Sequence, residues 1–179
     1  MILDLVPETH PLLTTKLESY DFSKTTVEEN LMIANDLIET MNHYNGLGLS
    51  ANQVGLTHRV FVMRGEEPII CFNPKIITIS NETILLEESC LSYPKLIVKV
   101  KRTRHIRVRY QDAQGEVFTR KFTNMTARIF LHEYDHLEGV IFYNKANLYY
   151  REQAFRNRNK NKPVKVKKDI LGEYREHLS

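Results

Sequence analysis

Residues 124–139 read NMTARIFLHEYDHLEG, and the rest of the chain can be organised around this segment. Asn124 or Thr123 can cap a helix at its start, and Gly139 can end that helix. We therefore predict a helix over 124–138.

This helix carries the pentapeptide His132-Glu133-Tyr134-Asp135-His136. Residues four apart share one helix face, so both imidazoles can reach one metal ion. Glu133 projects beside them, where it can take a proton from a water molecule. A polar helix face with two ordinary histidines is the plainer interpretation of the same five residues.

A catalytic metal site also needs a third protein ligand and an open coordination position. The chain has two cysteines. Cys71 lies in the apolar run Ile69–Phe72 and is predicted to be a buried strand residue. Cys90 lies in the stretch ESCLS, where we expect a strand to give way to a polar turn before Pro94. Cys90 is therefore the candidate third ligand.

A third motif, GLGLSANQ, occupies residues 46–53. Its plainer interpretation is a helix C-cap followed by a tight turn. It lacks the strand and helix that flank a dinucleotide-binding loop, and no Lys-Ser/Thr pair follows it for phosphates. The motif offers a backbone that a ligand can approach closely and, in Gln53, a side-chain amide that can donate a hydrogen bond.

The hydrophobic period changes along the rest of the chain. A capping-box pattern, in which Thr25 or Thr26 precedes a glutamate by three residues, begins a predicted amphipathic helix over 26–43. Short β-branched runs then recur at 59–63, 69–72, 75–79, 83–86, 96–100, 106–110 and 117–122. In one of them Ile106, Val108 and Tyr110 alternate with arginines, which predicts a half-buried strand with a basic outer face.

This order of elements predicts an α+β fold. We expect antiparallel sheets packed around a central metal-binding helix, with an N-terminal helix and a C-terminal basic extension. A length of 179 residues fits one catalytic domain over 1–150, followed by the basic extension over 151–179. A frayed helix and a short terminal helix from about Asp169 are expected in that extension.

Charge is distributed unevenly. Residues 1–90 hold five Lys/Arg against 13 Asp/Glu, whereas residues 91–179 hold 20 against nine. Such a split suggests a polyanionic partner for the C-terminal half, and a solvated basic face is the plainer alternative.

The longest apolar run is four residues, which excludes a transmembrane helix and a signal-peptide core. We expect free thiols and a cytoplasmic location.

The three motifs, in this order, resemble the peptide deformylase family. That family carries G-x-G-x-A-A-x-Q, E-G-C-L-S and H-E-x-D-H, which here read GLGLSANQ, ESCLS and HEYDH. The resemblance covers about residues 1–150. It implies a metal-dependent hydrolase that removes the formyl group from N-formylmethionyl nascent peptides and releases formate.

The resemblance also implies roles for individual residues. Cys90, His132 and His136 would bind one divalent metal ion, natively Fe²⁺, for which Zn²⁺, Ni²⁺ or Co²⁺ can substitute. Glu133 would be the general base and acid, while the Gln53 amide and the Leu91 backbone N–H would stabilise the developing oxyanion. The expected substrate-binding residues are Gly46, Gly48, Leu49, Ser89, Met125, Arg128 and Ile129.

Four positions depart from the family pattern, namely Ser50, Ser89, Arg128 and Leu131, and two of them bear on the substrate site. Ser89 stands where the family usually has glycine, and a positive φ there would strain the serine by about 1 kcal/mol. Arg128 lies one turn before His132, close to the expected methionine pocket. It can lay its stem along the pocket and expose its head, or it can favour an acidic or polar second substrate residue.

The expected partners are formylated nascent peptides and, through the basic residues of 151–179, the phosphates of ribosomal RNA. We expect a monomer with no membrane contact.

Two other functions remain alternatives. A zinc endopeptidase would use the same helix, but a thiolate third ligand is unusual for that class. An RNA- or ribosome-binding protein with a relict metal site is opposed by the intact Glu133 and Gln53.

Overall fold

A computed structural model describes residues 1–160 of the chain, and it combines helices with two antiparallel sheets. The larger sheet has the strand order β1-β2-β3-β6-β7, and the smaller one pairs β4 with β5. The strands are β1 Gly48–Ser50, β2 Val60–Met63, β3 Ile69–Ile79, β4 Thr83–Cys90, β5 Tyr93–Thr103, β6 His105–Gln111 and β7 Val117–Thr123. The helices are α1 Val27–His43, α2 Asn124–Leu137 and α3 Leu148–Asn159, with short 3₁₀ helices η1 Pro11–Thr14, η2 Phe22–Lys24, η3 Ala51–Val54 and η4 Phe142–Lys145. The predicted α+β class is confirmed.

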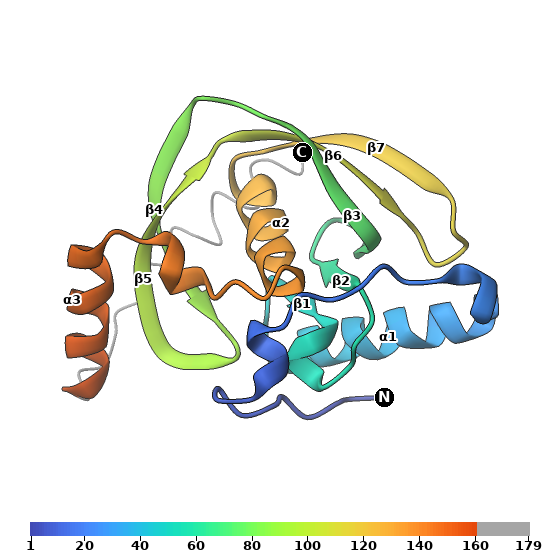
Figure 1. Ribbon diagram of the computed structural model, residues 1–179, viewed down its shortest axis with the longest axis horizontal. Helices are drawn as coiled ribbons and strands as arrows, with labels where there is room; N and C mark the ends of the chain where they lie inside the picture. The colour runs from blue at the N-terminus through green and yellow to red at the C-terminus, as the bar shows by residue number, and fades with distance from the viewer. Residues whose placement is uncertain (161–179) are drawn as a thin grey trace.

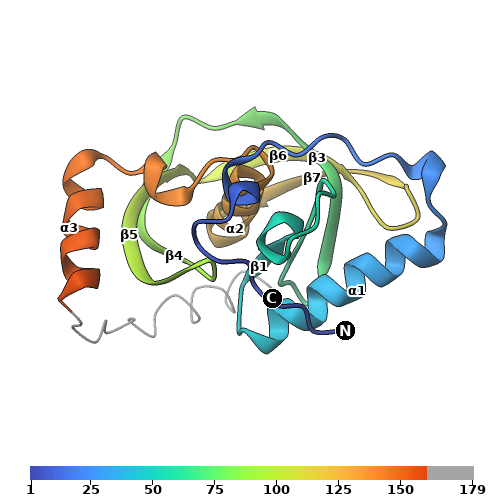
Figure 2. The ribbon, with the colours of Figure 1, turned by 60° about the horizontal axis from the view of Figure 1, so that its bottom comes forward.

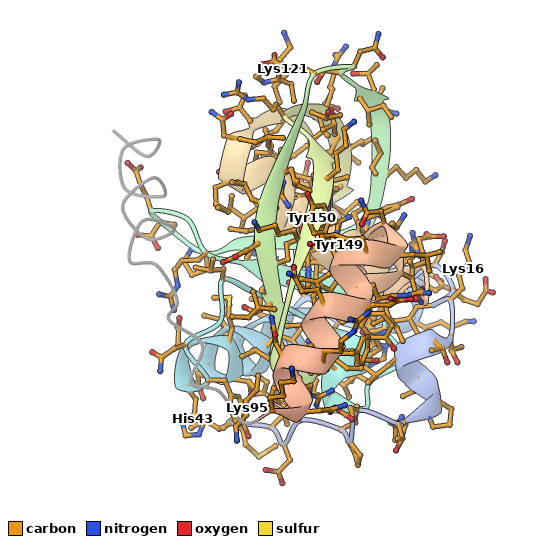
Figure 3. All side chains as sticks on the ribbon, turned by 90° about the vertical axis from the view of Figure 1, so that its left-hand side faces the viewer. Lys16, His43, Lys95, Lys121, Tyr149 and Tyr150 are labelled. Atoms are coloured by element: carbon orange, nitrogen blue, oxygen red, sulfur yellow. The ribbon has the colours of Figure 1, made fainter. Side chains whose placement is uncertain are left out.

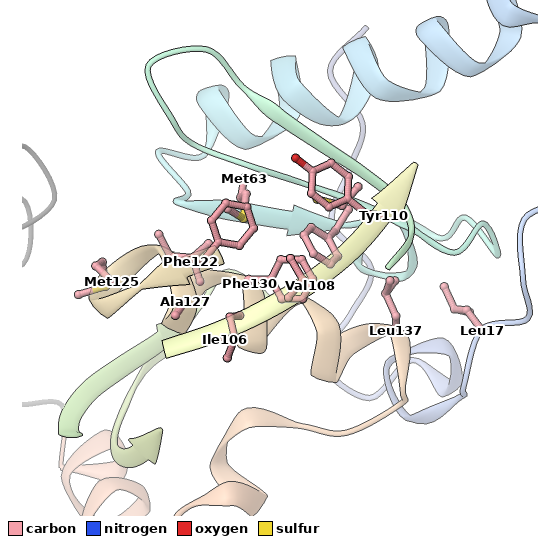
Figure 4. Close-up of a cluster of buried hydrophobic side chains, with 13 residues drawn as sticks. Leu17, Met63, Ile106, Val108, Tyr110, Phe122, Met125, Ala127, Phe130 and Leu137 are labelled. Atoms are coloured by element: carbon pink, nitrogen blue, oxygen red, sulfur yellow. The ribbon is translucent and has the colours of Figure 1, made fainter. Parts of the chain in front are cut away.

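Helix α2 lies between the two sheets, with α3 outside the smaller sheet and α1 at the other end of the molecule (Figures 1 and 2). The core-facing side of α2 packs on the inner face of the larger sheet. Alternate residues of β6, Ile106 and Val108, meet Ala127 and Phe130 of α2, and Phe122 of β7 joins them (Figure 4). The alternation therefore buries one face of β6 and leaves its arginines outside.

The predicted N-terminal helix is confirmed at α1. Thr26 is its N-cap, and the capping box with Glu29 is complete: each residue's side chain accepts a hydrogen bond from the other's backbone N–H. Leu37 and Met41 of α1 pack against β1 and β2 in a second buried cluster. The helix was predicted to end at residue 43, before the glycine-rich motif, and α1 ends at His43.

Two of the predicted strands are one. The runs 69–72 and 75–79 join as β3, because the chain continues through a bulge at Asn73 and Pro74. Asn73 has a φ of 47°, and its side chain holds this bulge by hydrogen bonds with both the N–H and the carbonyl of Tyr20. A bulge adds one unpaired residue without ending the strand.

Strand β4 is longer than predicted and contains Cys90 as its last residue. The polar turn expected around Cys90 is therefore limited to Leu91 and Ser92, before β5 begins at Tyr93. The strand register shifts between Ser89 and Cys90, and the Cys90 Sγ lies beside His136 of α2.

Helix α3 crosses the domain boundary predicted after residue 150. Ala154 is buried, and Tyr150 and Phe155 pack beside it on the cluster that includes Leu96 and Val98 of β5. Figure 3 shows Tyr149 and Tyr150 at the start of this helix. The first part of the expected extension is thus an ordered helix docked on the smaller sheet. The short helix expected from Asp169 lies outside the described residues.

Among the helices that the structure describes, none combines the length and the apolar character needed to cross a bilayer.

The N-terminal arm is fastened to the end of α2. The Leu17 N–H donates to the Leu137 carbonyl at 2.9 Å, and the Arg59 guanidinium donates to the carbonyls of both residues. Gly139, which follows this helix end, has a φ of 68°, and a Cβ there would lie 2.7 Å from the Thr14 carbonyl oxygen. The close approach of the arm therefore requires glycine at 139.

We predict that Gly139→Ala destabilises the protein more than Gly115→Ala. Both residues have positive φ, which costs alanine about 1–2 kcal/mol, but a Cβ at 115 would meet only the Phe22 ring at 3.6 Å. The backbone clash at 139 should add about 1–3 kcal/mol. Urea unfolding of the two variants measures the difference, and equal losses would show that the arm does not pack against Gly139.

Candidate metal centre

Three potential metal ligands meet between α2 and the end of β4. The Cys90 Sγ lies 3.2 Å from the His136 Nε2, and the ligand atoms of Cys90, His132 and His136 all lie within 4.8 Å of one another. The two histidines are one turn apart on α2, with ring centroids separated by 5.2 Å. All three side chains are buried. The structure therefore brings together the three residues that the sequence nominated.

This donor set fits a tetrahedral transition metal. Typical metal–sulfur and metal–nitrogen bonds in a tetrahedron place a sulfur and a nitrogen ligand roughly 3.5 Å apart. The observed separation of Cys90 Sγ and His136 Nε2 is close to that value. Burial lowers the pKa of His136 well below its usual value, so this imidazole is neutral and its lone pair can bind a cation.

Cys71 does not belong to the centre. It is fully buried in β3 among apolar residues, and burial raises the pKa of its thiol well above the usual value. The thiol therefore stays protonated and packs as an apolar side chain, as predicted.

Glu88 orients His132. Its Oε2 lies 3.1 Å from the His132 Nδ1, which leaves Nε2 as the ring nitrogen for a metal. Burial alone would raise the pKa of Glu88, but hydrogen bonds from His132 and Arg102 hold it well below its usual range. The carboxylate is therefore a fixed negative charge two residues before Cys90 on the same strand.

Two arginines hold Glu88 in place. Arg102 of β5 donates to both carboxylate oxygens, at 2.9 and 3.0 Å, and also to Asp135 of α2 at 2.5 Å. Arg128 donates to the Glu88 Oε1 at 2.6 Å. These charges are buried and mutually paired, so they connect β4, β5 and α2 at the candidate centre.

The sequence analysis missed Glu88 and Arg102 as site residues. A signal for Arg102 was present, because Leu96, Val98 and Val100 alternate along β5 and put Arg102 in the same inward phase. An arginine at a buried position implies a buried carboxylate partner. Nothing in the local pattern said which carboxylate that partner is.

Glu133 is buried against β1. The Ser50 hydroxyl donates to its Oε2 at 2.8 Å, and burial raises the pKa of Glu133 to about 7. A Cβ on Gly48 would lie 2.5 Å from the Glu133 Oε1, so only glycine permits this approach of strand to helix. Glu133 therefore sits beside the metal ligands in a position fixed by the glycine-rich motif.

The Gln53 amide is also fixed in orientation. Its Oε1 accepts from the Ser50 N–H at 2.8 Å, and its Nε2 donates to the Ser92 hydroxyl at 3.0 Å. The same Nε2 lies 3.6 Å from the Cys90 Sγ. A donor is thus held at the edge of the candidate metal position.

A cavity of about 620 Å³ opens onto this centre. The predicted residues that line it are Gly46, Gly48, Gln53, Ser89, Cys90, Leu91, Met125, Arg128, Ile129, His132 and Glu133. Leu5, Tyr44, Leu47, Glu87, Pro94 and Lys95 also line it and were not predicted. Leu49 does not line it, since its side chain is fully buried under α1. Leu49 was predicted as part of a strand-like contact with the substrate backbone along 46–49, and that contact stays a prediction, since its backbone lies in β1.

The structure bears on the two departures at Ser89 and Arg128. Ser89 is an exposed residue of β4 and is absent from the residues with positive φ, so the condition for strain is not met. Arg128 is 3% exposed, so its head does not reach solvent. Its guanidinium donates to Glu88 and to the carbonyls of Ile84 and Val100, so the interpretation with an exposed head is wrong. A preference for an acidic or polar second substrate residue stays a prediction, and Arg128 lines the cavity.

Comparisons with known proteins point to one family. A family model described as polypeptide deformylase matches residues 2–152. The peptide deformylase of Thermotoga maritima is 44% identical over 119 residues, which are 65% of this chain and 73% of that protein. The crystal structure of peptide deformylase from T. maritima has a TM-score of 0.77 at 37% identity and covers 82% of this chain and 99% of its own. A Met-Ala-Ser-bound structure of the class I type b peptide deformylase from Acinetobacter baumannii has a TM-score of 0.77 at 28% identity, over 81% of this chain and 98% of that one.

We predict that Arg102→Met lowers the free energy of unfolding by about 3–5 kcal/mol, because it leaves Glu88 and Asp135 buried without their partner. The matched control is Arg156→Met, which removes an exposed ion pair with Glu152 four residues away on α3 and should change stability by less than about 0.5 kcal/mol. Denaturant unfolding compares them. A wild-type midpoint for Arg102→Met would mean that the buried network does not hold the fold together.

Proposed function

This chain belongs to the peptide deformylase family, and we propose that Cys90, His132 and His136 are the ligands of its catalytic metal ion. As a member of that family it is a hydrolase that removes the formyl group from N-formylmethionyl peptides. The observation that carries the site assignment is the convergence of one thiol and two imidazoles on the cavity that also contains Glu133 and Gln53.

The chemistry of the donors supports a soft-to-borderline divalent cation, and we propose Fe²⁺, with Zn²⁺, Ni²⁺ or Co²⁺ able to substitute. When bound, such a cation supplies Lewis-acid chemistry, which polarises the formyl carbonyl and lowers the pKa of water. Asp135 does not compete as a ligand, because its carboxylate pairs with Arg102 and Lys145.

Glu133 is proposed as the general base and then the general acid. Its carboxylate lies in the cavity, and the Ser50 hydroxyl holds one of its oxygens. It takes a proton from the attacking water and delivers that proton to the amine nitrogen as the bond to the formyl carbon breaks. The products are formate and a peptide with a free N-terminal methionine.

Gln53 and Leu91 are proposed to stabilise the negative charge that develops on the formyl oxygen. The Gln53 Nε2 is positioned by Ser50 and Ser92, and Leu91 follows Cys90 directly and lines the same cavity. One such donor typically contributes about 2.7–4 kcal/mol to transition-state stabilisation. Because the Gln53 amide is fixed before substrate binds, it needs no reorganisation during the reaction.

The peptide backbone is proposed to bind along β1. This strand is the edge of the larger sheet, and its Gly48 lines the cavity together with Gly46. An extended peptide can add to such an edge by main-chain hydrogen bonds. Met125 and Ile129 lie on the α2 side of the cavity and supply apolar contacts for the methionine side chain.

The two alternative functions are not supported. A zinc endopeptidase would be expected to use histidine or glutamate where this chain has Cys90. A binding protein with a relict metal site does not account for the fixed positions of Glu133 and Gln53.

Contact of the basic extension with ribosomal RNA stays a prediction, because most of that extension lies outside the described residues. A cytoplasmic location and a monomeric state also stay predictions.

We predict that the full chain releases formate from formyl-Met-Ala-Ser and leaves acetyl-Met-Ala-Ser uncleaved. Glu133→Gln should lower kcat/KM by about 10²–10⁴-fold because it removes the proton carrier. Bound metal, measured by elemental analysis, should be unchanged. The control is Glu87→Gln, an exposed carboxyl on the same cavity, which should retain activity. Undiminished formate release by Glu133→Gln would exclude Glu133 as the base.

We predict that the Co²⁺-loaded protein shows a thiolate-to-metal charge-transfer absorption that Cys90→Ala abolishes and Cys71→Ala retains. Thiolate is the soft ligand of this donor set, and Cys71 is buried away from the centre. Absorption spectroscopy of the chelated and reloaded protein measures this. Persistence of the band in Cys90→Ala would reject Cys90 as a ligand.

A further inference from the structure

The outer face of the larger sheet is a cationic surface that deformylation does not use. Ile106 and Val108 of β6 point toward α2. Arg107 and Arg109 alternate with them along the strand and are therefore exposed on the opposite face of the sheet. Lys121 of β7 and Lys75 of β3 are exposed beside them. We call Lys75, Arg107, Arg109 and Lys121 the basic face. Lys121 lies at the upper edge of the view in Figure 3.

The strand register sets the spacing of these charges. Arg107 is directly opposite Lys121, and Arg109 is directly opposite Lys75. Paired strands lie about 4.8 Å apart, and residues two apart along a strand are separated by about 7 Å. The basic face is therefore a compact array of positive charges on a rigid sheet.

This arrangement opposes the stability of the sheet. Like charges directly opposite each other on paired strands are destabilising. Among residues 1–160, no acidic side chain forms an ion pair with any of the four, and the Arg109 Nε makes only a 3.5 Å contact with the Thr119 hydroxyl. In the smaller sheet the equivalent exposed pair is Glu87 opposite Lys99, with opposite charges. Two unfavourable pairs on one face are explained by a ligand that carries closely spaced negative charges.

We propose that the basic face binds the phosphate backbone of double-helical RNA. Two of its cations are guanidinium groups, which match phosphate oxygens in a bidentate manner. The other residues in the cross-strand rows of the four cations are Thr78 and Thr119, so those rows contain no aromatic ring on which a base could stack. Recognition of the backbone in preference to the bases follows.

The choice of RNA rests on the family's activity toward nascent polypeptides, which are made on RNA. A membrane surface fits less well. Binding to a bilayer favours large or aromatic apolar anchors beside the cations. The rows that hold the four cations contain otherwise only threonine, and exposed apolar residues on the same strands near them, such as Ile77 and Val117, are β-branched and carry no aromatic ring.

The test uses the full chain and a fluorescently labelled 20-base-pair RNA duplex, with anisotropy measured between 50 and 200 mM salt. The variant is Arg107→Thr/Lys121→Thr, since threonine keeps a high strand propensity. The control is Lys99→Thr/Lys101→Thr, which removes the same charge from exposed positions of β5. Wild-type affinity should fall steeply with salt. In the basic-face variant the slope of log K against log salt should be less steep by about two, because two phosphate contacts are removed. Its affinity at 50 mM salt should be lower by on the order of a hundredfold.

Two further measurements separate binding from folding and from catalysis. Thermal unfolding of the basic-face variant should occur at or above the wild-type temperature, because a like-charge pair has been removed. Both variants should deformylate formyl-Met-Ala-Ser at the wild-type rate, so loss of RNA binding is distinguishable from failure of the proposed function. Wild-type RNA affinity in the basic-face variant, an equal loss in the control, or binding to anionic phospholipid vesicles in place of RNA would each overturn the proposal.

Discussion

Glu88 is the residue through which the fold and the candidate metal centre depend on each other. Each oxygen of its carboxylate accepts two hydrogen bonds, from Arg102 and Arg128 at Oε1 and from Arg102 and His132 at Oε2. These four bonds use the whole acceptor capacity of an ionised carboxylate. Because the group is buried, the bonds are strong and the loss of any donor is costly. One carboxylate therefore joins β4 to β5 and α2, and it orients a ligand as it does so.

A second constraint acts on the other side of α2. Glu133 is adjacent to His132 in sequence, but one helical step turns its side chain by about 100°, toward β1. Its carboxylate can lie there only because Gly48 has no side chain, and the Ser50 hydroxyl then holds it. The two histidine ligands and the base thus share α2 but depend on different neighbouring elements. The geometry of the reaction is set by how closely β1 and β4 approach α2.

Much of the fold followed from periodicity and caps. Patterns among residues close together in the sequence predicted three elements: the helix after Thr26, the alternating strand at Ile106–Tyr110 and the helix ending before Gly139. Strand ends were less accurate. Asn73 and Pro74 resemble a strand break, yet hydrogen bonds to Tyr20, 53 residues away, keep β3 continuous. A contact at that separation leaves no periodic trace in the sequence.

The sequence by itself determined the chemistry that is available: a thiol, two imidazoles one helical turn apart, a glutamate beside them and a glutamine after a glycine-rich motif. Tertiary structure decided which of these groups meet and how they are held. Glu88 finds its partners 14, 40 and 44 residues away, in Arg102, Arg128 and His132. Local patterns report only near neighbours, because helix and strand periods extend over a few residues. Pairing of buried charges is set by the packing of whole elements, so it emerged only when α2 lay between the two sheets.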